Sequence, residues 1–283
     1  MSELPAPETF LSGEPRSVGG RRALLRARAA DALLGARASL ARTGAQLEAL
    51  ATAAPRRSVL VMSVYRPPAG RLVDGLRSLR SERHDVTLRL GSTAAPVDEL
   101  GEHTVATEMS AGKFENLNTL WPGEAPDWTI VVDDDVGLPD RFLDRFIGVA
   151  ERFELAMAQP AQTRASHAAW SVTRRRGGAL LRETRFVEIG PVTAFRRDAA
   201  DELIPFPPLR YGWGLDAHWA AVAEERGWRC GVIDALPVRH DEGAVAATYS
   251  GDEAIEEARR FLADRPYVTS ARLQETLAVH RRA

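Results

Sequence analysis

The chain has 283 residues, of which 45% are hydrophobic and 27% charged, and this composition excludes a disordered or fibrous protein. Its formal net charge is −2, so the molecule as a whole has no electrostatic attraction to nucleic acid, and we expect no nucleic-acid partner. The single cysteine, Cys230, excludes an internal disulfide framework, and we expect a buried structural thiol. No stretch approaches the roughly 18 apolar residues that span a bilayer, and no secretory signal is present, so we expect a cytoplasmic protein.

The first 55 residues differ in composition from the rest. Residues 1–20 are rich in Pro, Gly, Ser and Glu, which predicts a disordered tail. Residues 21–55 are rich in Ala, Leu and Arg and predict a helical extension with one apolar side, marked by Leu33, Leu40 and Leu47.

This helical extension is also strongly basic. Between Arg16 and Arg42 there are seven arginines and one acidic residue, Asp31. Such a helix either packs on the body of the protein or on a second subunit, or it lies on an anionic membrane. Peripheral contact with the inner face of the membrane and dimerisation through residues 21–55 therefore both remain open.

From residue 56 onward, short apolar strands alternate with amphipathic helices. The expected strands cover residues 58–64, 85–90, 104–108, 128–132, 155–158, one or two segments within 182–195, and 230–233. The expected helices cover residues 73–80, 112–121, 140–153, 217–226 and 254–263. This alternation predicts an α/β domain over residues 56–283, with a mostly parallel, Rossmann-like sheet and helices on both faces.

Three aspartates, Asp133, Asp134 and Asp135, directly follow the expected strand at 128–132. Side chains alternate along a strand, so Asp133 and Asp135 should point one way and Asp134 the other. Two carboxylates at the carboxyl end of a strand suit Mn²⁺ or Mg²⁺, and this is where open α/β sheets bind ligands. The alternative is an acidic, solvated turn, which repulsion among three adjacent carboxylates disfavours.

Two enzyme classes place carboxylates at such a strand end. Asp133 to Val136 resembles the short Asp-x-Asp-x-Thr/Val pattern of haloacid-dehalogenase-like phosphatases, in which Asp133 would be the nucleophile and Asp135 the acid/base. That class needs a basic residue downstream of the motif, whereas the only lysine, Lys113, lies upstream.

A broader resemblance is to nucleotide-sugar glycosyltransferases of GT-A type, in particular the large inverting family two. The similar segments, in order, are Ser58–Val64, Ala111–Asn118 with its Gly-Lys-x-x-x-x-Asn pattern, Asp133–Leu143, Ile189–Arg197, Tyr211–Asp216 and Gly227–His240. A narrower likeness is to an uncharacterised, plant-type family that shares Gln159-Pro160-Ala161, Ser166-His167, Phe186-Val187-Glu188 and Gly212–Asp216.

The resemblance implies a role for each candidate residue. Asp133 and Asp135 would bind the metal, Mn²⁺ or Mg²⁺, with His240 as a third ligand. The residues that would bind the nucleotide sugar are Tyr65, Lys113, Asp133 and Asp134, and those on the acceptor side are Glu188, Trp213 and His167.

Asp216 would be the catalytic base that takes the proton of the acceptor hydroxyl. Its alternative role is that of a helix N-cap, for which Asp is a favoured residue. The family carries a Glu-Asp pair at this place, but the first position here is Leu215, which departs from the family pattern.

The sequence therefore predicts a metal-dependent glycosyltransferase. Its expected partners are a nucleoside-diphosphate sugar, with uridine as the expected nucleoside, and a hydroxyl acceptor, and we expect inversion at the anomeric carbon. Two alternatives remain open: a haloacid-dehalogenase-like phosphatase and a transferase fold without catalytic activity.

Overall fold

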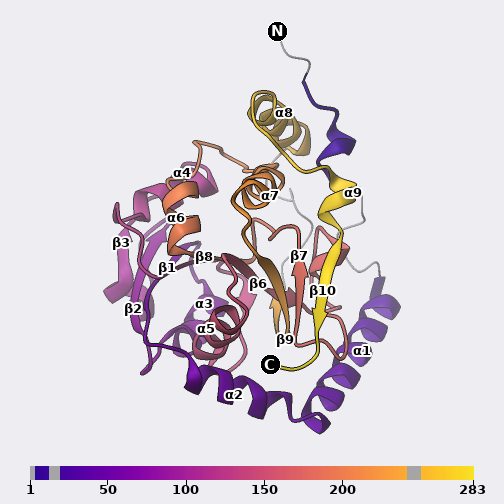
Figure 1. Cartoon of the computed structure of the whole chain (residues 1–283). Coiled ribbons are helices and arrows are strands. Elements are labelled where there is room, and N and C mark those ends of the chain that lie inside the picture. Colours follow the sequence, from indigo (N-terminus) through magenta and orange to yellow (C-terminus); the bar gives the residue numbers. More distant parts are fainter. Residues whose placement is uncertain (1–3, 13–19, 241–249) are drawn as a thin grey trace.

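The computed structural model describes residues 4–12, 20–240 and 250–283 (Figure 1). Within these residues a ten-stranded sheet has the order β10-β7-β9-β6-β8-β4-β1-β2-β3, and β5 pairs with β9. The strands are β1 Ser58–Tyr65, β2 Asp85–Ser92, β3 Thr104–Ala106, β4 Trp128–Val132, β5 Val136–Gly137, β6 Met157–Gln162, β7 Leu181–Thr184, β8 Val192–Arg196, β9 Cys230–His240 and β10 Thr276–His280. The α-helices are α1 Gly20–Leu40, α2 Thr43–Ala53, α3 Gly70–Leu79, α4 Lys113–Leu120, α5 Phe142–Arg152, α6 Arg197–Leu203, α7 Leu215–Arg226, α8 Gly251–Leu262 and α9 Ser270–Leu273. Short 3₁₀ helices cover Pro7–Thr9, Asp98–His103 and Ser171–Thr173.

The sheet is mixed but mostly parallel, which confirms the expected α/β class. Strands β4, β1, β2 and β3 run parallel to one another, and β6 and β9 form a second parallel pair. Strand β8 lies between these groups and runs antiparallel to both β4 and β6, while β7 runs antiparallel to β9 and β10. The carboxyl ends of β4, β6 and β9 therefore lie along the same edge of the sheet.

Helices cover both faces of the sheet because the strand side chains alternate between two apolar cores. Val59 and Val61 of β1 belong to the core that includes residues of α2, α3 and α5. Leu60 and Met62 belong to the opposite core, which includes residues of α4, α6, α7 and α8. The expected covering of both faces is therefore confirmed.

The structure differs from the expected elements mainly at positions where pairing with a distant strand overrides local pattern. Strands β6 and β9 extend past their expected ends at 158 and 233 to Gln162 and His240. Helix α6 and strand β10 were not expected from the sequence. The short edge strand β10 gains its backbone partners only by pairing with β7.

Within the expected disordered tail, residues 4–12 have a defined packing, whereas 1–3 and 13–19 lie outside the described residues. The Phe10 side chain is 1% exposed and belongs to the same core as α7 and α8. The Ser270 hydroxyl donates a hydrogen bond of 2.8 Å to the Glu8 carbonyl oxygen. The burial of Phe10 thus fixes residues 4–12 on the protein, although their polar composition predicts disorder.

The expected helical extension consists of two helices, and the chain turns between them at Arg42, whose φ is +53°. Helix α2 buries Leu47 and Leu50 against the body of the protein. It approaches α5 so closely that a Cβ added at Gly148 would lie 2.6 Å from the backbone nitrogen of Ala51. A glycine in α5 is therefore what allows α2 to dock.

The single thiol is buried, as expected for a structural cysteine. Burial raises the pKa of Cys230 to about 12, so the group stays a protonated, unreactive thiol at neutral pH.

The contact between α2 and α5 gives a test of this packing. We expect Gly148→Ala to destabilise the protein by about 1–3 kcal/mol, the usual cost of overpacking, despite the better helix propensity of alanine. Gly44→Ala in α2 is the matched control, because a Cβ there meets nothing within 4 Å. Urea denaturation measures both, and equal midpoints for Gly148→Ala and the unchanged protein would contradict the close approach.

Candidate active site

The candidate site begins where β4 ends, at Val132. The Asp133 backbone N–H donates to the Pro191 carbonyl oxygen at 2.8 Å, and the chain then turns into the short strand β5. In β5, Val136 pairs with His240, the last residue of β9. This register brings the neighbouring Asp135 carboxylate to 3.0 Å from His240 Nε2.

Three predicted metal ligands come together here. One ligand atom from each of Asp133, Asp135 and His240 lies within 4.8 Å of the others. Two carboxylate oxygens and one imidazole nitrogen form a donor set that fits a divalent cation such as Mn²⁺. Asp134 turns away, and its Oδ2 accepts a hydrogen bond of 2.7 Å from the Arg66 backbone N–H.

The alternation of the three aspartates was predicted from strand geometry, but the structure produces it differently. Residues 133–135 follow the strand in a turn rather than continuing it. The opposite orientations of Asp134 and Asp135 depend on their separate partners, Arg66 and His240.

Electrostatics couple Asp135 and His240. Burial alone would raise the pKa of Asp135, but the hydrogen bond and charge of His240 hold it below its ordinary value. Burial alone would lower the pKa of His240, but Asp135 and then the charges of Asp133 and Glu188 raise it. A cation bound by the pair would take the place of the imidazole proton, so metal binding should release a proton.

Lys113 extends this cluster. Its Nζ lies 2.6 Å from Asp133 Oδ1 and donates a hydrogen bond of 3.1 Å to the Ile189 carbonyl oxygen. Gly190 makes room for the pair, because a Cβ there would lie 2.7 Å from Asp133 Oδ2 and 3.1 Å from Lys113 Nζ. Lys113 is the first residue of α4, so the start of this helix also faces the acidic cluster.

A second pair of carboxyl groups, Glu188 and Asp216, is buried. Burial, and then the charge of Asp216, raises the pKa of Glu188 to about 8. Burial raises the pKa of Asp216 to about 7, against the opposing effect of hydrogen bonds from Ala217 and Trp170. Two carboxyl groups that titrate near neutral pH suit proton transfer, and such groups are concentrated at active sites.

Asp216 does not occupy the N-cap position of α7, although its carboxylate satisfies one backbone N–H of the first helical turn. The N-cap of α7 is Gly214, with φ +86°, and Asp216 is the second residue of the helix. The Asp216 Oδ1 accepts a hydrogen bond of 2.9 Å from the Ala217 backbone N–H. Leu215, where the family pattern has an acid, is fully buried in the apolar core.

Of the remaining predicted residues, His167 contacts the cluster, whereas Trp213 and Tyr65 belong to the apolar cores. The His167 ring centroid is 5.9 Å from that of His240, and the His167 backbone N–H donates to the His240 carbonyl oxygen at 3.3 Å. Trp213 is 9% exposed and belongs to the apolar core around α7 and α8. Tyr65 is fully buried in the other core, with its hydroxyl 2.9 Å from Thr104 Oγ1. The predicted contact of Tyr65 with a nucleotide sugar is therefore wrong for this structure, because the side chain is enclosed in the core.

Sequence reasoning missed two side chains that hold Glu188 in place. The Gln162 side chain donates a hydrogen bond of 2.9 Å to Glu188 Oε2. Gln159 was noted only as part of a family motif, and its Oε1 accepts a hydrogen bond from the Glu188 backbone N–H. Both lie on β6, which is buried at every residue. A glutamine in a buried strand needs a polar partner, and this was the feature of the sequence that could have indicated their role.

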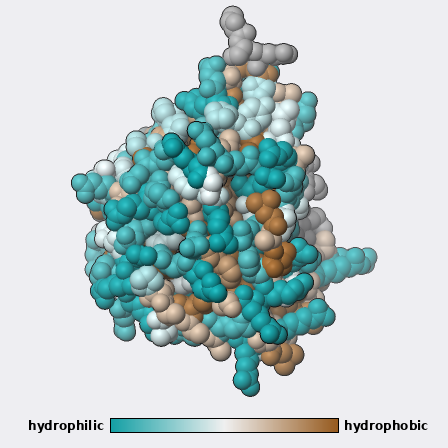
Figure 2. Space-filling view, in the orientation of Figure 1, coloured by the Kyte–Doolittle hydropathy of each residue, from teal (hydrophilic) through white to brown (hydrophobic). Residues whose placement is uncertain are grey.

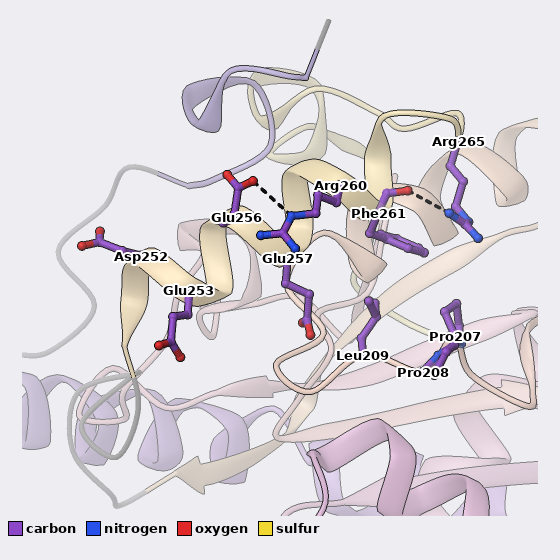
Figure 3. Close-up of a pocket in the computed structure, with 10 residues that line it drawn as sticks. All are labelled: Pro207, Pro208, Leu209, Asp252, Glu253, Glu256, Glu257, Arg260, Phe261 and Arg265. Carbon is purple, nitrogen blue, oxygen red and sulfur yellow. Dashed lines mark hydrogen bonds and ion pairs between the residues drawn. The ribbon is translucent and has the colours of Figure 1, made fainter. Parts of the chain in front are cut away.

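A separate hollow of about 660 Å³ lies between α8 and the segment before Tyr211 (Figure 3). None of the predicted site residues lines it; the lining residues are Pro207, Pro208, Leu209, Asp252, Glu253, Glu256, Glu257, Arg260, Phe261 and Arg265. Glu257 accepts backbone N–H bonds from Arg210, Tyr211 and Gly212. Helix α8 thus braces the turn that leads to Asp216.

No protein-family model and no curated protein matches this sequence. Among solved structures, the fold is similar to that of GalNAc-T7 with UDP, GalNAc and Mn²⁺, at a TM-score of 0.52 and 11% identity over 72% of this chain and 48% of that chain. The mannosyltransferase PcManGT from Pyrobaculum calidifontis, in complex with GDP-Man and Mn²⁺, gives a TM-score of 0.44 and 18% identity over 71% of this chain and 65% of that chain. This chain thus spans less than two thirds of the length of either protein. It has the GT-A glycosyltransferase fold.

The three-ligand arrangement predicts which aspartate controls metal affinity. We expect Asp135→Asn to weaken Mn²⁺ binding by at least about 10–100-fold, since even the loss of an outer-shell partner has that effect. The matched control, Asp134→Asn, should keep the affinity, because Asp134 turns towards Arg66. Titration calorimetry with Mn²⁺ alone measures both, and equal losses in the two variants would contradict the site.

Proposed function

We propose that this protein is a metal-dependent glycosyltransferase that transfers a sugar from a nucleoside diphosphate to a hydroxyl acceptor. The observation that carries the proposal is the meeting of Asp133, Asp135 and His240 at the carboxyl end of β4 in a GT-A fold. Ligands of open α/β sheets bind along this edge.

Asp133, Asp135 and His240 would hold the cation. When bound, a divalent cation neutralises charge that develops on the diphosphate leaving group. The imidazole nitrogen in the donor set favours Mn²⁺, since Mg²⁺ prefers oxygen ligands alone. Mn²⁺ is also present in the GalNAc-T7 structure.

Lys113 and Asp134 would complete the donor subsite. Lys113 is the only lysine in the chain, and its ammonium group lies beside Asp133 with 30% of the side chain exposed. It can therefore contact a diphosphate oxygen without breaking its bond to the backbone. We propose a uridine diphosphate donor, and the UDP in the similar GalNAc-T7 structure supports this choice.

Asp216 would act as the base on the acceptor side. Its carboxylate takes the hydroxyl proton while the acceptor oxygen bonds to the anomeric carbon and the bond from that carbon to the diphosphate breaks, which inverts the configuration. With a pKa of about 7, Asp216 is ionised in a substantial fraction of molecules at neutral pH. Glu188, with a pKa of about 8, remains protonated and can donate a hydrogen bond to the acceptor or the sugar.

Donor binding is tested by thermal shift with UDP, GDP, ADP and CDP, each with and without Mn²⁺. We expect stabilisation that needs both UDP and Mn²⁺, about 2.7 kcal/mol when the ligand is at 100 times its Kd, and its loss in Asp135→Asn. A larger shift with GDP would correct the nucleoside but keep the class. No shift with any nucleotide, with turnover of a generic phosphomonoester, would indicate a phosphatase instead. No shift and no turnover would indicate a fold without catalytic activity.

The base is tested by Asp216→Asn, which should keep donor binding and lose transfer. In the unchanged protein, transfer should rise with pH through about 7, because only ionised Asp216 accepts the proton. Normal transfer by the variant would contradict the role.

Stability should respond to pH in the opposite direction. Because the folded state raises the pKa of Asp216, it binds the proton more tightly than the unfolded chain does. The stability contributed by this group is therefore present below the ordinary carboxyl pKa and falls by about 1.4 kcal/mol per pH unit as the pH rises towards 7. Asp216→Asn removes this loss. Between pH 5 and 7, the free energy of unfolding of the variant should therefore fall by about 1.4 kcal/mol less per pH unit than that of the unchanged protein, and melting curves at several pH values measure the difference.

A further inference from the structure

Helix α1 lies on the surface without burying any of its 21 residues. Three of its leucines are large and open to solvent: Leu25 is 64% exposed, Leu33 53% and Leu40 86%. Leu47, seven residues beyond Leu40, is only 3% exposed because α2 packs on the body. The packing expected for the helical extension thus holds for α2, while one side of α1 remains open.

The exposed residues of α1 form an ordered stripe. Positions three and four apart lie on one side of a helix, and such positions give an apolar line of Leu25, Ala29, Ala32, Leu33, Ala36 and Leu40, all exposed. Five exposed arginines lie along the same helix: Arg21, Arg22, Arg26, Arg28 and Arg37. Figure 2 shows hydrophilic side chains projecting at the edge where Figure 1 places α1, with hydrophobic ones at its lower end.

The one acidic residue of α1 faces the body of the protein. The Asp31 carboxylate accepts hydrogen bonds from the backbone N–H groups of Arg164, at 2.9 Å, and Ala165, at 3.0 Å. A Cβ added at Gly177 would lie 2.6 Å from the Leu34 side chain, so this leucine also faces inward. The outer side of α1 therefore carries arginines and leucines but no acid.

We propose that α1 docks this protein on the surface of an anionic lipid bilayer. The leucines would enter the boundary between head groups and acyl chains, and the arginines would extend to the lipid phosphates. Basic residues near an anionic membrane each contribute to binding, and the leucines add buried apolar area. No helix of the described residues is long and apolar enough to cross a membrane, so α1 would lie in the plane of the surface.

Charge favours this occupant over a second copy of the chain or a nucleic acid. A dimer through the same stripe would bring two sets of five arginines together without an acid to compensate them. A nucleic acid would match the arginines but leave the three leucines in water. The chain as a whole has a net charge of −2, so repulsion of the remaining surface would orient α1 towards the bilayer.

Docking through α1 has a consequence for the candidate site. Asp31 binds the loop that leads to His167, on the expected acceptor side. This loop contacts the inner side of α1, so it would lie about one helix diameter, roughly 10 Å, from the membrane surface. The docking itself does not depend on the proposed transferase activity.

Flotation with vesicles tests the proposal on the full chain. We expect it to float with phosphatidylcholine vesicles that contain 30% phosphatidylglycerol, but not with phosphatidylcholine alone, and to dissociate as salt is raised. Replacing two arginines, Arg26→Gln with Arg37→Gln, should weaken partitioning by about 30-fold. Replacing Leu25, Leu33 and Leu40 together by serine should weaken it by at least about tenfold.

Matched controls separate the stripe from general surface charge. Arg77→Gln with Arg282→Gln, two exposed arginines outside α1, and Leu277→Ser, an exposed leucine of β10, should leave partitioning unchanged. Equal losses in the controls, or equal flotation with neutral vesicles, would overturn the proposal. A lipid-free dimer that dissociates in the triple leucine variant would instead assign the stripe to a second copy, and duplex DNA that competes fully with vesicles would assign it to nucleic acid. Circular dichroism and the melting temperature of each variant report that the fold is kept.

Discussion

The candidate site depends on a short antiparallel pairing, that of β5 with the end of β9. Val136 opposite His240 is the contact that brings an imidazole to the aspartates after β4. The pairing is possible because β9 continues to His240, far past the buried stretch at its start. Without those extra residues, the cluster found among the described residues would offer two carboxylates and no imidazole ligand.

The site divides its carboxyl groups between two environments. Asp135 is paired with His240, and its pKa is lowered, so it remains an anion that can bind a cation. Glu188 and Asp216 are buried, and their pKa values are raised towards neutrality, so they can hold or accept a proton. The difference comes from burial and partners rather than from residue type, as pKa tuning in enzymes requires. The proposed cation site and the proposed proton-transfer groups therefore differ in their electrostatic surroundings.

The scaffold holds these groups through close backbone approaches. Gly190 leaves room for the pair of Lys113 and Asp133, and Gly212, with φ +76°, avoids a clash with the Phe114 ring. Glu257 fixes the turn before Asp216 through three backbone N–H groups. The candidate site side chains are therefore held by close packing between helices and strands that are far apart in the sequence. Helix α1 does not take part in this packing, because its outer side has no partner within the described residues.

The sequence by itself determined the periodic elements and the position of the aspartates, because strand alternation, helix propensity and turns act over a few neighbouring residues. It therefore predicted an α/β sheet and a carboxylate cluster after β4. Only the tertiary structure decided that Asp216 is buried, that Tyr65 belongs to the core and that Gln162 holds Glu188. The family resemblance already named His240 as a ligand, but His240 is about a hundred residues from Asp135 in the chain, and only strand pairing brings the two side chains together. Burial and long-range pairing set these roles, and neither has a signature in local sequence.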